Sequence, residues 1–430
     1  MGGFLQLLRS NRNYRLLWIG QVISEIGDHF NTVAVFSLVV HRTGSGALVS
    51  GVMIARALPM LLAGPLAGVW LDRADRRQLM ILSDVVRAGL ALGFLAALEP
   101  RDLWLLFPLS ALLMFASPFF TSGRAAILPS IVEPERLHTA NSLTKITQWA
   151  TITAGAMLGG LAVARYGYAW AFVVNSVSFL FSAACVARLH SPRGFRPVNG
   201  CVLETPVLQP WRDYVEGLRY IRSVPLILAI CLTQVGWATG GGAAQVLFTL
   251  FGEVVYPYGA MGLGTIWGFA GVGLLVGGVL ASWAGLRLDF QGYKRWIGWA
   301  FLLHAVAYIG FSQARPFWLV LLMIALSRLG MGVAGVFNTT LLLRHVADAY
   351  RGRVFATIET LSWTTMMASM ALAGWFSTSW HPRQIGLAAG LASCSTFVIW
   401  ATMDRSGKLQ PAPQTELPLQ EVEVRGKPVV

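Results

Sequence analysis

Apolar stretches long enough to cross a lipid bilayer recur along most of the chain, and they restrict its fold more than any other feature. Inside hydrocarbon the backbone must satisfy its own hydrogen bonds, and runs of about 20 apolar residues have the length that a spanning helix requires. The mean hydropathy of +0.59 and the 12% of charged residues exclude an ordinary soluble domain of 430 residues. The sequence therefore predicts an all-α integral membrane protein.

We expect twelve transmembrane helices, whose boundaries follow the apolar pattern. They are 14–40, 47–71, 78–98, 103–128, 139–164, 169–187, 225–251, 260–286, 294–312, 316–343, 353–378 and 384–403. The segments at 14–40, 139–164 and 353–378 carry polar residues that a hydropathy test penalises, but omitting any of them would break the alternation of charge between successive loops.

The net charge of +13 could indicate a nucleic-acid partner, but its distribution favours a membrane protein instead. Most of the 33 Lys and Arg residues fall in alternate loops of the expected topology. The intervening loops carry only Arg42, Arg101, Arg165, Arg315 and Arg383. By the positive-inside rule, both termini of this multi-pass protein are expected in the cytoplasm, and no nucleic acid is expected as a partner.

The longest interruption of the apolar pattern divides the chain into an N-terminal bundle (1–187) and a C-terminal bundle (225–403). The linker (188–224) contains an expected amphipathic helix whose apolar face would lie on the inner leaflet. That face comprises Trp211, Val215, Leu218 and Ile221. The polar tail (404–430) is expected to be disordered.

A compact polar turn separates the segments at 47–71 and 78–98. It reads Gly64-Pro-Leu-Ala-Gly-Val-Trp-Leu-Asp-Arg-Ala-Asp-Arg-Arg77. Gly64 and Gly68 share one helix face and would let another backbone approach closely. Asp72 and Asp75 can accept hydrogen bonds at a helix start, and the turn's arginines (Arg73, Arg76 and Arg77) hold it out of the hydrocarbon.

This turn resembles the signature loop G-x-L-A-G-x-x-x-D-R-x-D-R-R of the major facilitator superfamily. Further matches resemble the enterobactin-exporter-like branch, which includes macrolide-efflux-type pumps. They are Asn13-Tyr-Arg-Leu-Leu-Trp, Gly27-Asp28, Thr43-Gly-Ser, Leu58-Pro59, Asp84 with Arg87-Ala88, Arg124, Leu128-Pro129, Glu135-Arg136-Leu137 and Ala140-Asn141. The resemblance implies the major facilitator fold, with two pseudo-symmetric six-helix bundles. It also implies that the loop closes the cytoplasmic side near the start of the eleventh helix, where Asp72, Arg73, Arg124 and Glu359 would form a gate network.

Ionisable residues inside expected membrane helices are costly and therefore functional candidates. Glu25 and Asp28 lie three residues apart on one face, which suits reversible proton uptake, and Arg56 is the expected counter-charge. A purely structural ion pair is the alternative. Asp84 and Arg87 are expected near the cytoplasmic end, either as a local structural pair or in transport. Arg328 has no acid within one turn and must find a partner elsewhere, such as an anionic substrate group.

Small residues in the fifth expected helix have two interpretations. Gly155, Gly159 and Gly160 are similar to the G-P-x-x-G-G element of the superfamily's proton-coupled exporters, although Ala156 replaces the proline. Close helix packing explains the same glycines equally well.

Several enzyme and cofactor motifs are absent from the sequence. There is no phosphate-binding G-x-x-x-x-G-K-[ST], no H-E-x-x-H, no G-x-S-x-G and no C-x-x-C. We therefore expect no enzyme activity, no cofactor and no metal site, and uphill transport would have to use an ion gradient.

The sequence and the resemblance together predict a monomeric, proton-coupled antiporter of the bacterial inner membrane. It would export an amphipathic organic molecule, a siderophore or a drug-like compound, by alternating access. A lysophospholipid carrier on the same fold and a non-transporting membrane sensor remain as alternatives.

Overall fold

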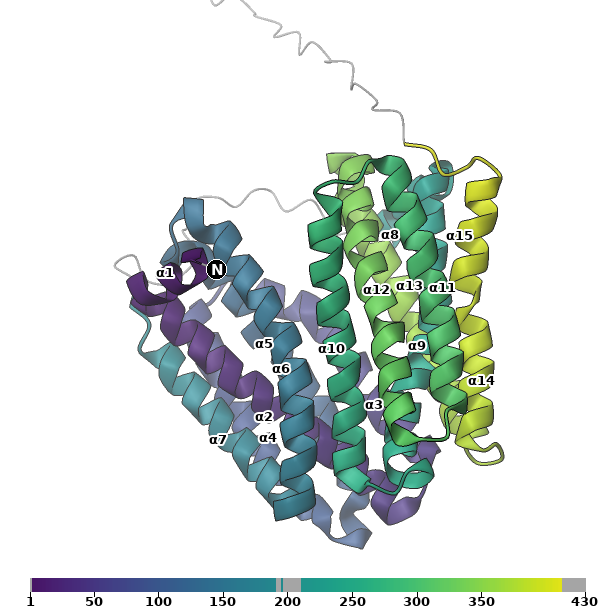
Figure 1. The fold of residues 1–430 in the computed structure, drawn as a ribbon. Helices are drawn as coiled ribbons and strands as arrows, with labels where there is room; N and C mark the ends of the chain where they lie inside the picture. Colours follow the sequence, from purple (N-terminus) through teal and green to yellow (C-terminus); the bar gives the residue numbers. More distant parts are fainter. Residues whose placement is uncertain (1, 191–194, 196–209, 412–430) are drawn as a thin grey trace, which may run out of the picture.

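The computed structural model describes residues 2–190, 195 and 210–411, and these residues form helices without any strand (Figure 1). The all-α prediction is thereby confirmed. The long helices are α2 (Arg12–Thr43), α3 (Gly46–Leu71), α4 (Arg76–Gly93), α5 (Leu106–Ile131), α6 (Leu137–Tyr166), α7 (Tyr168–Ala187), α9 (Pro225–Leu250), α10 (Gly259–Gly285), α11 (Phe290–Gln313), α12 (Phe317–His345) and α13 (Asp348–Phe376). The shorter ones are α1 (Gly2–Ser10), α8 (Pro210–Ser223), α14 (Pro382–Ser393) and α15 (Ser395–Arg405), with 3₁₀ turns at Ala96–Leu98, Pro100–Leu105 and Pro134–Arg136 and a π-helical turn, η4, at Phe251–Val255.

Short turns with specific caps join the long helices. Gly44 ends α2 with a φ of 64°, a conformation that glycine adopts without steric cost. Ser45 follows, and its side chain accepts a hydrogen bond from the backbone N–H of Leu48 at the start of α3. Two residues therefore suffice to reverse the chain, so α2 and α3 must run antiparallel.

Nine segments of the described chain are both long and apolar enough to span a membrane. The segment Pro134–Tyr166 is among them, with the lowest hydropathy of the nine, 1.2. Helices α2, α11 and α13 have 32, 24 and 29 residues, which is sufficient length, but their polar residues keep them outside this group. Twelve spans and two six-helix bundles therefore remain a prediction.

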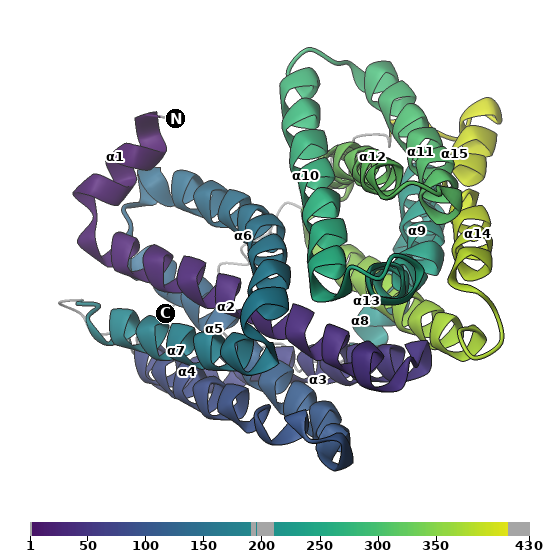
Figure 2. The same ribbon diagram turned by 60° about the horizontal axis from the view of Figure 1, so that its bottom comes forward.

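The helices gather in two groups, α2–α7 and α9–α15 (Figures 1 and 2). We call these groups the N-terminal half and the C-terminal half. We call the end that carries the turn at residues 72–75 the basic end, and the other end, which carries residues 44–45, the opposite end. Helix α6 packs against α10, and α3 against α13, so these two pairs join the halves.

The two halves touch closely at the opposite end. A Cβ atom added to Gly160 of α6 would lie 2.5 Å from the carbonyl oxygen of Ala260 on α10. A Cβ atom added to Gly374 of α13 would collide with the Ser50 hydroxyl of α3. Larger residues would clash at both positions, so small side chains permit this closure.

At the basic end, by contrast, no described part of the C-terminal half covers α3. Leu66 and Trp70 are exposed, and nothing lies within 4 Å of a Cβ atom added to Gly64 or Gly68. The expected close approach of another backbone to these two glycines is therefore wrong for this conformation. The halves are thus apart along α3 at this end. Helices α6 and α10 stay packed toward the basic end, because a Cβ atom added to Gly278 of α10 would meet Trp149 of α6.

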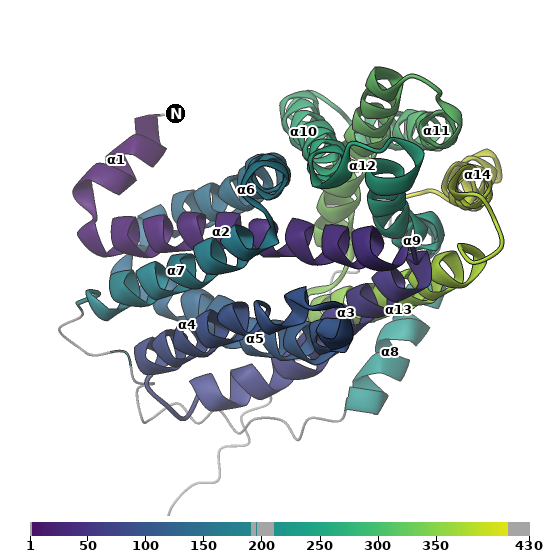
Figure 3. The same cartoon turned by 90° about the horizontal axis from the view of Figure 1, so that it is seen from below.

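Helix α8 packs on α13 (Figure 3), and its expected position on the inner leaflet stays a prediction. Ile221 is fully buried, and a Cβ atom added to Gly217 would lie 2.9 Å from the carbonyl oxygen of Arg353. Glu216 forms an ion pair of 2.9 Å with Arg353, and the rings of Tyr220 and Tyr350 stack at 4.7 Å. The expected helix is present, and the side that packs on α13 carries Glu216, Gly217 and Tyr220, whereas Val215 and Leu218 of the expected apolar face are half-buried.

Single cysteines in a cysteine-free variant test the predicted orientation. Those placed at Ser45 and Arg101 should react with a membrane-impermeant maleimide on intact cells, because both positions lie at the opposite end. Those at Gln78 and Arg287 should react only after permeabilisation. Reversed labelling would overturn the orientation, and outside labelling of Gln78 alone would contradict the placement of α3 and α4.

Candidate functional site

A cavity of about 430 Å³ lies in the N-terminal half between α2, α3, α4, α5 and α6. Its wall brings together five of the predicted charged residues, which are Glu25, Asp28, Arg56, Arg87 and Arg124. Several intramembrane charges around one hollow are costly unless they are paired or hydrated. The chemistry of the cavity therefore depends on which groups pair with these charged side chains.

Glu25 is held by three polar side chains from three helices. Its carboxylate lies 3.5 Å from the Arg124 guanidinium of α5 and accepts hydrogen bonds of 2.7 Å from both Gln21 and Thr151. Thr151 belongs to α6, so this carboxylate ties α2 to α5 and α6. Arg124 was expected to pair with the signature loop, and the structure corrects this by pairing it with Glu25.

Asp28 belongs to a second charge cluster, in which Arg87 is the cation. The Arg87 guanidinium lies 3.9 Å from the Asp28 carboxylate and also pairs with Asp84, one helical turn away on α4. It lies over the ring of Phe179 at 4.3 Å from the centroid. Asp84 is fully buried and Arg87 lines the cavity, and the pair lies near the middle of α4, not near the cytoplasmic end as expected.

Arg56 is not the counter-charge that we expected for the α2 acids. Its guanidinium donates hydrogen bonds to Thr32 at 3.0 Å and to Asn31 at 3.4 Å, both neutral side chains. It also lies over the Phe36 ring at 5.8 Å. Arg87 and Arg124 take the role predicted for Arg56, since neither acid of α2 lies within ion-pair distance of Arg56.

The signature loop is fixed by its own half of the molecule. Asp75 accepts a hydrogen bond of 3.1 Å from the backbone N–H of Gln78 and so caps α4. Arg76 donates to the carbonyl oxygen of Ala126 on α5 at 3.0 Å, and Arg77 donates to that of Val186 on α7 at 3.2 Å.

The predicted gate network is not formed in this conformation. Asp72, Arg73 and Glu359 make no ion pair among the residues that the structure describes. Asp72 instead occupies the position that ends α3. The open basic end along α3 explains this result, because no described neighbour packs on Gly64 and Gly68 just before the loop.

The glycines of α6 lie against other helices. A Cβ atom added to Gly155 would meet His29 of α2, and one added to Gly159 would meet Phe30. Gly160 faces α10. This geometry supports close packing as their role.

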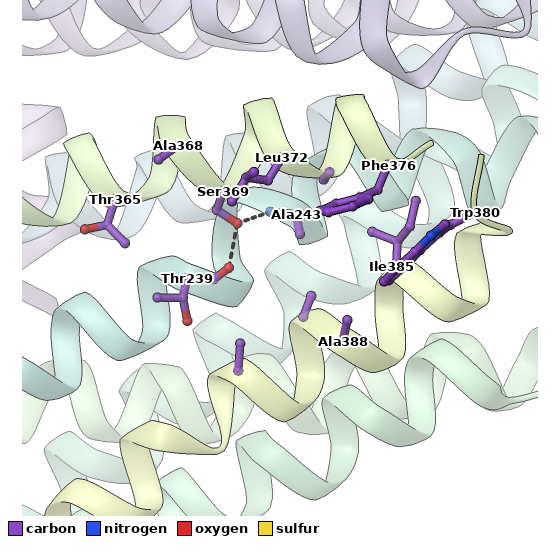
Figure 4. A pocket seen from close by; sticks show the side chains of 13 residues that line it. Thr239, Ala243, Thr365, Ala368, Ser369, Leu372, Phe376, Trp380, Ile385 and Ala388 are labelled. Atoms are coloured by element: carbon purple, nitrogen blue, oxygen red, sulfur yellow. Dashed lines mark hydrogen bonds between the residues drawn. The ribbon is translucent and has the colours of Figure 1, made fainter. Parts of the chain in front are cut away.

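A second cavity of about 290 Å³ lies between α9, α13 and α14, and none of the predicted residues lines it (Figure 4). Its walls are mostly apolar, and Phe376 and Trp380 lie near the opposite end. The Ser369 hydroxyl donates to the carbonyl oxygen of Thr239 at 2.5 Å and accepts from the backbone N–H of Ala243 at 2.9 Å. The Thr239 and Thr365 hydroxyls donate to backbone carbonyl oxygens, and the described wall carries no charged side chain, so this cavity offers little to an ionic ligand.

The sequence analysis missed Glu253, which connects the two halves at the opposite end. The Ser37 hydroxyl of α2 donates a short hydrogen bond to the Glu253 carboxylate on η4. Glu253 lies between two apolar segments, and the sequence analysis did not single it out. An acidic residue that lies directly beside an apolar segment is a pattern that could have identified Glu253 as a candidate.

Comparison with known proteins gives a family match and several relatives. The model of the Major Facilitator Superfamily matches residues 17–291. A protein named as a bacilysin exporter, BacE of Bacillus subtilis (strain 168), is 24% identical over 83% of this chain and 86% of its own length. Macrolide efflux protein A of Streptococcus pyogenes is 21% identical, covering 84% and 88%. The MFS-type transporter YfiS of Bacillus subtilis (strain 168) is 27% identical, but the match spans 57% of this chain and 55% of that protein.

Solved structures share the fold. A bacterial homologue of the iron transporter ferroportin, in an inward-facing state, has a TM-score of 0.64 at 19% identity and covers 91% of this chain and 99% of its own. A POT family transporter in complex with a thioalcohol-conjugated peptide has a TM-score of 0.67 at 10% identity, with coverage of 92% and 96%.

Replacing Arg87 tests the buried charge cluster. Arg87→Met leaves the buried Asp84 carboxylate and the half-buried Asp28 carboxylate without their cation, and this should cost about 3–5 kcal/mol of stability. The measurement is the thermal unfolding midpoint of the purified protein. Adding Asp28→Asn and Asp84→Asn to the same variant should recover much of the loss.

The matched control is Arg101→Met, because Arg101 pairs with Asp102 on the surface. It should change stability by about 1 kcal/mol or less. Equal unfolding midpoints for the Arg87 and Arg101 variants would contradict the proposed dependence of α2 and α4 on Arg87.

Proposed function

Because the chain belongs to the Major Facilitator Superfamily, we propose that it is a proton-coupled exporter of an amphipathic organic molecule, working by alternating access. We place it in the bacterial inner membrane as a monomer with both termini in the cytoplasm. The observation that carries the proposal is the cavity with two ion-paired acids, Glu25 and Asp28, on a single helix.

The position of the cavity supports an inward-open state. The halves are in contact at the opposite end and apart along α3 at the basic end. If the basic end is cytoplasmic, cargo reaches the cavity from inside the cell. Export then requires closing the basic end and parting the contacts around Gly160, Gly374 and Glu253.

Each acid of the cavity can link proton uptake to a change in helix contacts. Protonation of Asp28 would remove its attraction for Arg87, leaving Arg87 with Asp84 alone. Protonation of Glu25 would release Arg124 of α5. A proton and the ion pair thus compete for the same carboxylate, and this competition is what coupling requires.

The lining of the cavity supports an amphipathic cargo. Met60, Met114, Phe120 and Trp149 stand beside the charged and hydroxyl side chains. Methionine and aromatic side chains adapt to varied apolar shapes, whereas the charged groups fix orientation. Siderophores and drug-like compounds combine these properties, and two of the relatives are named for export or efflux. A lysophospholipid is less favoured, because an acyl chain gains nothing from so many charges.

The signature loop is proposed to close the basic end after cargo has bound. Asp72, Arg73 and Glu359 could pair once α3 and α13 also approach each other at the basic end. In that state Gly64 and Gly68 would provide the small surface that a neighbouring backbone needs.

Proteoliposomes with an imposed pH gradient test the coupling role of the α2 acids. The probes are erythromycin, enterobactin and ethidium, and wild-type protein should concentrate at least one of them. Glu25→Gln combined with Asp28→Asn should abolish uphill accumulation while sparing downhill exchange, because binding survives when coupling is lost.

Glu99→Gln is the matched control, because Glu99 is an exposed acid at the opposite end, and it should transport normally. Uphill accumulation by the double variant would exclude α2 as the coupling site. Failure of the wild-type protein to move any probe would contradict the exporter assignment.

A further inference from the structure

The apolar cavity between α9, α13 and α14 is a groove on the outside of the C-terminal half (Figure 4). Helices α13 and α14 both pack along α9 but not along each other, so α9 forms the floor of the groove and the other two helices form its walls. Small buried side chains, including Ala243, Ala373 and Ala389, keep its interior empty. Its rims are open, because the Leu372 side chain is 58% exposed and Ala388 is exposed as well.

The open side of the groove faces away from the other half of the molecule. Gly374 of α13 lies against Ser50 of α3, and two residues turn an α-helix by about 200°, so Leu372 points in nearly the opposite direction. The segments Pro225–Val255 and Pro382–Arg405, which supply α9 and α14, are both long and apolar enough to span a membrane. The groove therefore opens to the hydrocarbon of the bilayer, and not to the polar cavity of the N-terminal half.

The groove has the length of one membrane leaflet. Its wall on α13 extends from Thr365 to Phe376, which is about 17 Å at ~1.5 Å per residue. The hydrocarbon core of a bilayer is about 30 Å thick, so each leaflet contributes about 15 Å. At the opposite end the groove reaches Trp380, and tryptophan is enriched at the level of the lipid headgroups. A chain in the groove would therefore extend from the headgroups to the middle of the bilayer.

The groove is preformed, because hydrogen bonds fix α13 on its floor. The Ser369 hydroxyl of α13 bridges the backbone N–H of Ala243 and the carbonyl oxygen of Thr239, which lie one turn apart on α9. The described lining carries no charged side chain, so an uncharged, flexible chain can enter without separating an ion pair. These properties favour an acyl chain over a polar ligand.

We propose that this groove binds one acyl chain of a phospholipid from the leaflet at the opposite end. Within a bilayer the gain comes from van der Waals contact, because the atoms that line an empty groove lack partners and a fitted chain supplies them. The chain would lie between Leu372 and Ala388, with the glycerol and the phosphate level with Trp380. The inference goes beyond the proposed function and does not depend on the direction of transport or on its coupling.

Native mass spectrometry tests whether the groove is occupied. The protein is released from nanodiscs of palmitoyl-oleoyl phosphatidylcholine and washed with detergent, and the wild-type protein should keep one phospholipid per chain. Ala368→Trp and Ala388→Trp fill the groove from its two walls, and each should lower the retained fraction about tenfold. Ala371→Trp is the matched control, because Ala371 is exposed on α13 outside the groove, and it should retain lipid as the wild-type protein does.

A photoreactive lipid locates the chain in the wild-type protein, so this measurement does not depend on the folding of any variant. The probe is a phosphatidylcholine with a diazirine in the middle of one acyl chain, and mass spectrometry maps the labelled residues after illumination. Label on Leu372 should exceed label on Val306 of α11 by about fivefold, because a bound chain stays in place. Val306 is 62% exposed, and both residues lie within about 11 Å of the opposite end at ~1.5 Å per residue.

Loss of all phospholipid from the washed wild-type protein, equal labelling of Leu372 and Val306, or unchanged lipid retention in both groove variants would overturn the inference. A stable dimer with crosslinks between the α13 and α14 faces of two copies would also overturn it, because a second copy would then fill the groove.

Discussion

Burying charge in a low-dielectric interior is costly, and α2 carries two carboxylates that must meet this cost inside the protein. Arg124 and Arg87, on α5 and α4, supply the compensating charge, and Thr151 of α6 adds a hydrogen bond. The ion pairs and the hydrogen bond of these two acids thus hold α2, α4, α5 and α6 in position relative to one another. The same side chains line the polar cavity between these helices and α3.

Contact between the halves depends on small residues, not on charge. Gly160 and Gly374 allow backbones to approach at the opposite end, and the Ser37–Glu253 hydrogen bond adds a polar contact there. The glycines of the signature loop's helix, Gly64 and Gly68, have no such neighbour in this state. A carrier that alternates would exchange one set of small-residue contacts for the other.

The sequence predicted the helices well, because hydrophobic period and caps are local properties. The segment expected at 47–71 is α3 at Gly46–Leu71, and Asp75 caps the next helix as its position suggested. Pairings between distant helices were predicted poorly. Nothing local indicates that Arg87, and not Arg56, reaches Asp28, or that Arg124 faces Glu25, because these choices depend on how the helices rotate and tilt when they pack. The cover that α13 provides for α8 was missed for the same reason.

The central claim is that the carboxylates of Glu25 and Asp28 bind and release protons in the cavity. Infrared difference spectroscopy of the protein in lipid, recorded on stepping the pH downward, detects this directly. We predict a protonated-carboxyl band that grows as the pH falls and is lost in the Glu25→Gln, Asp28→Asn double variant. A band of unchanged size in that variant, or no carboxyl band in the wild-type protein, would contradict the account.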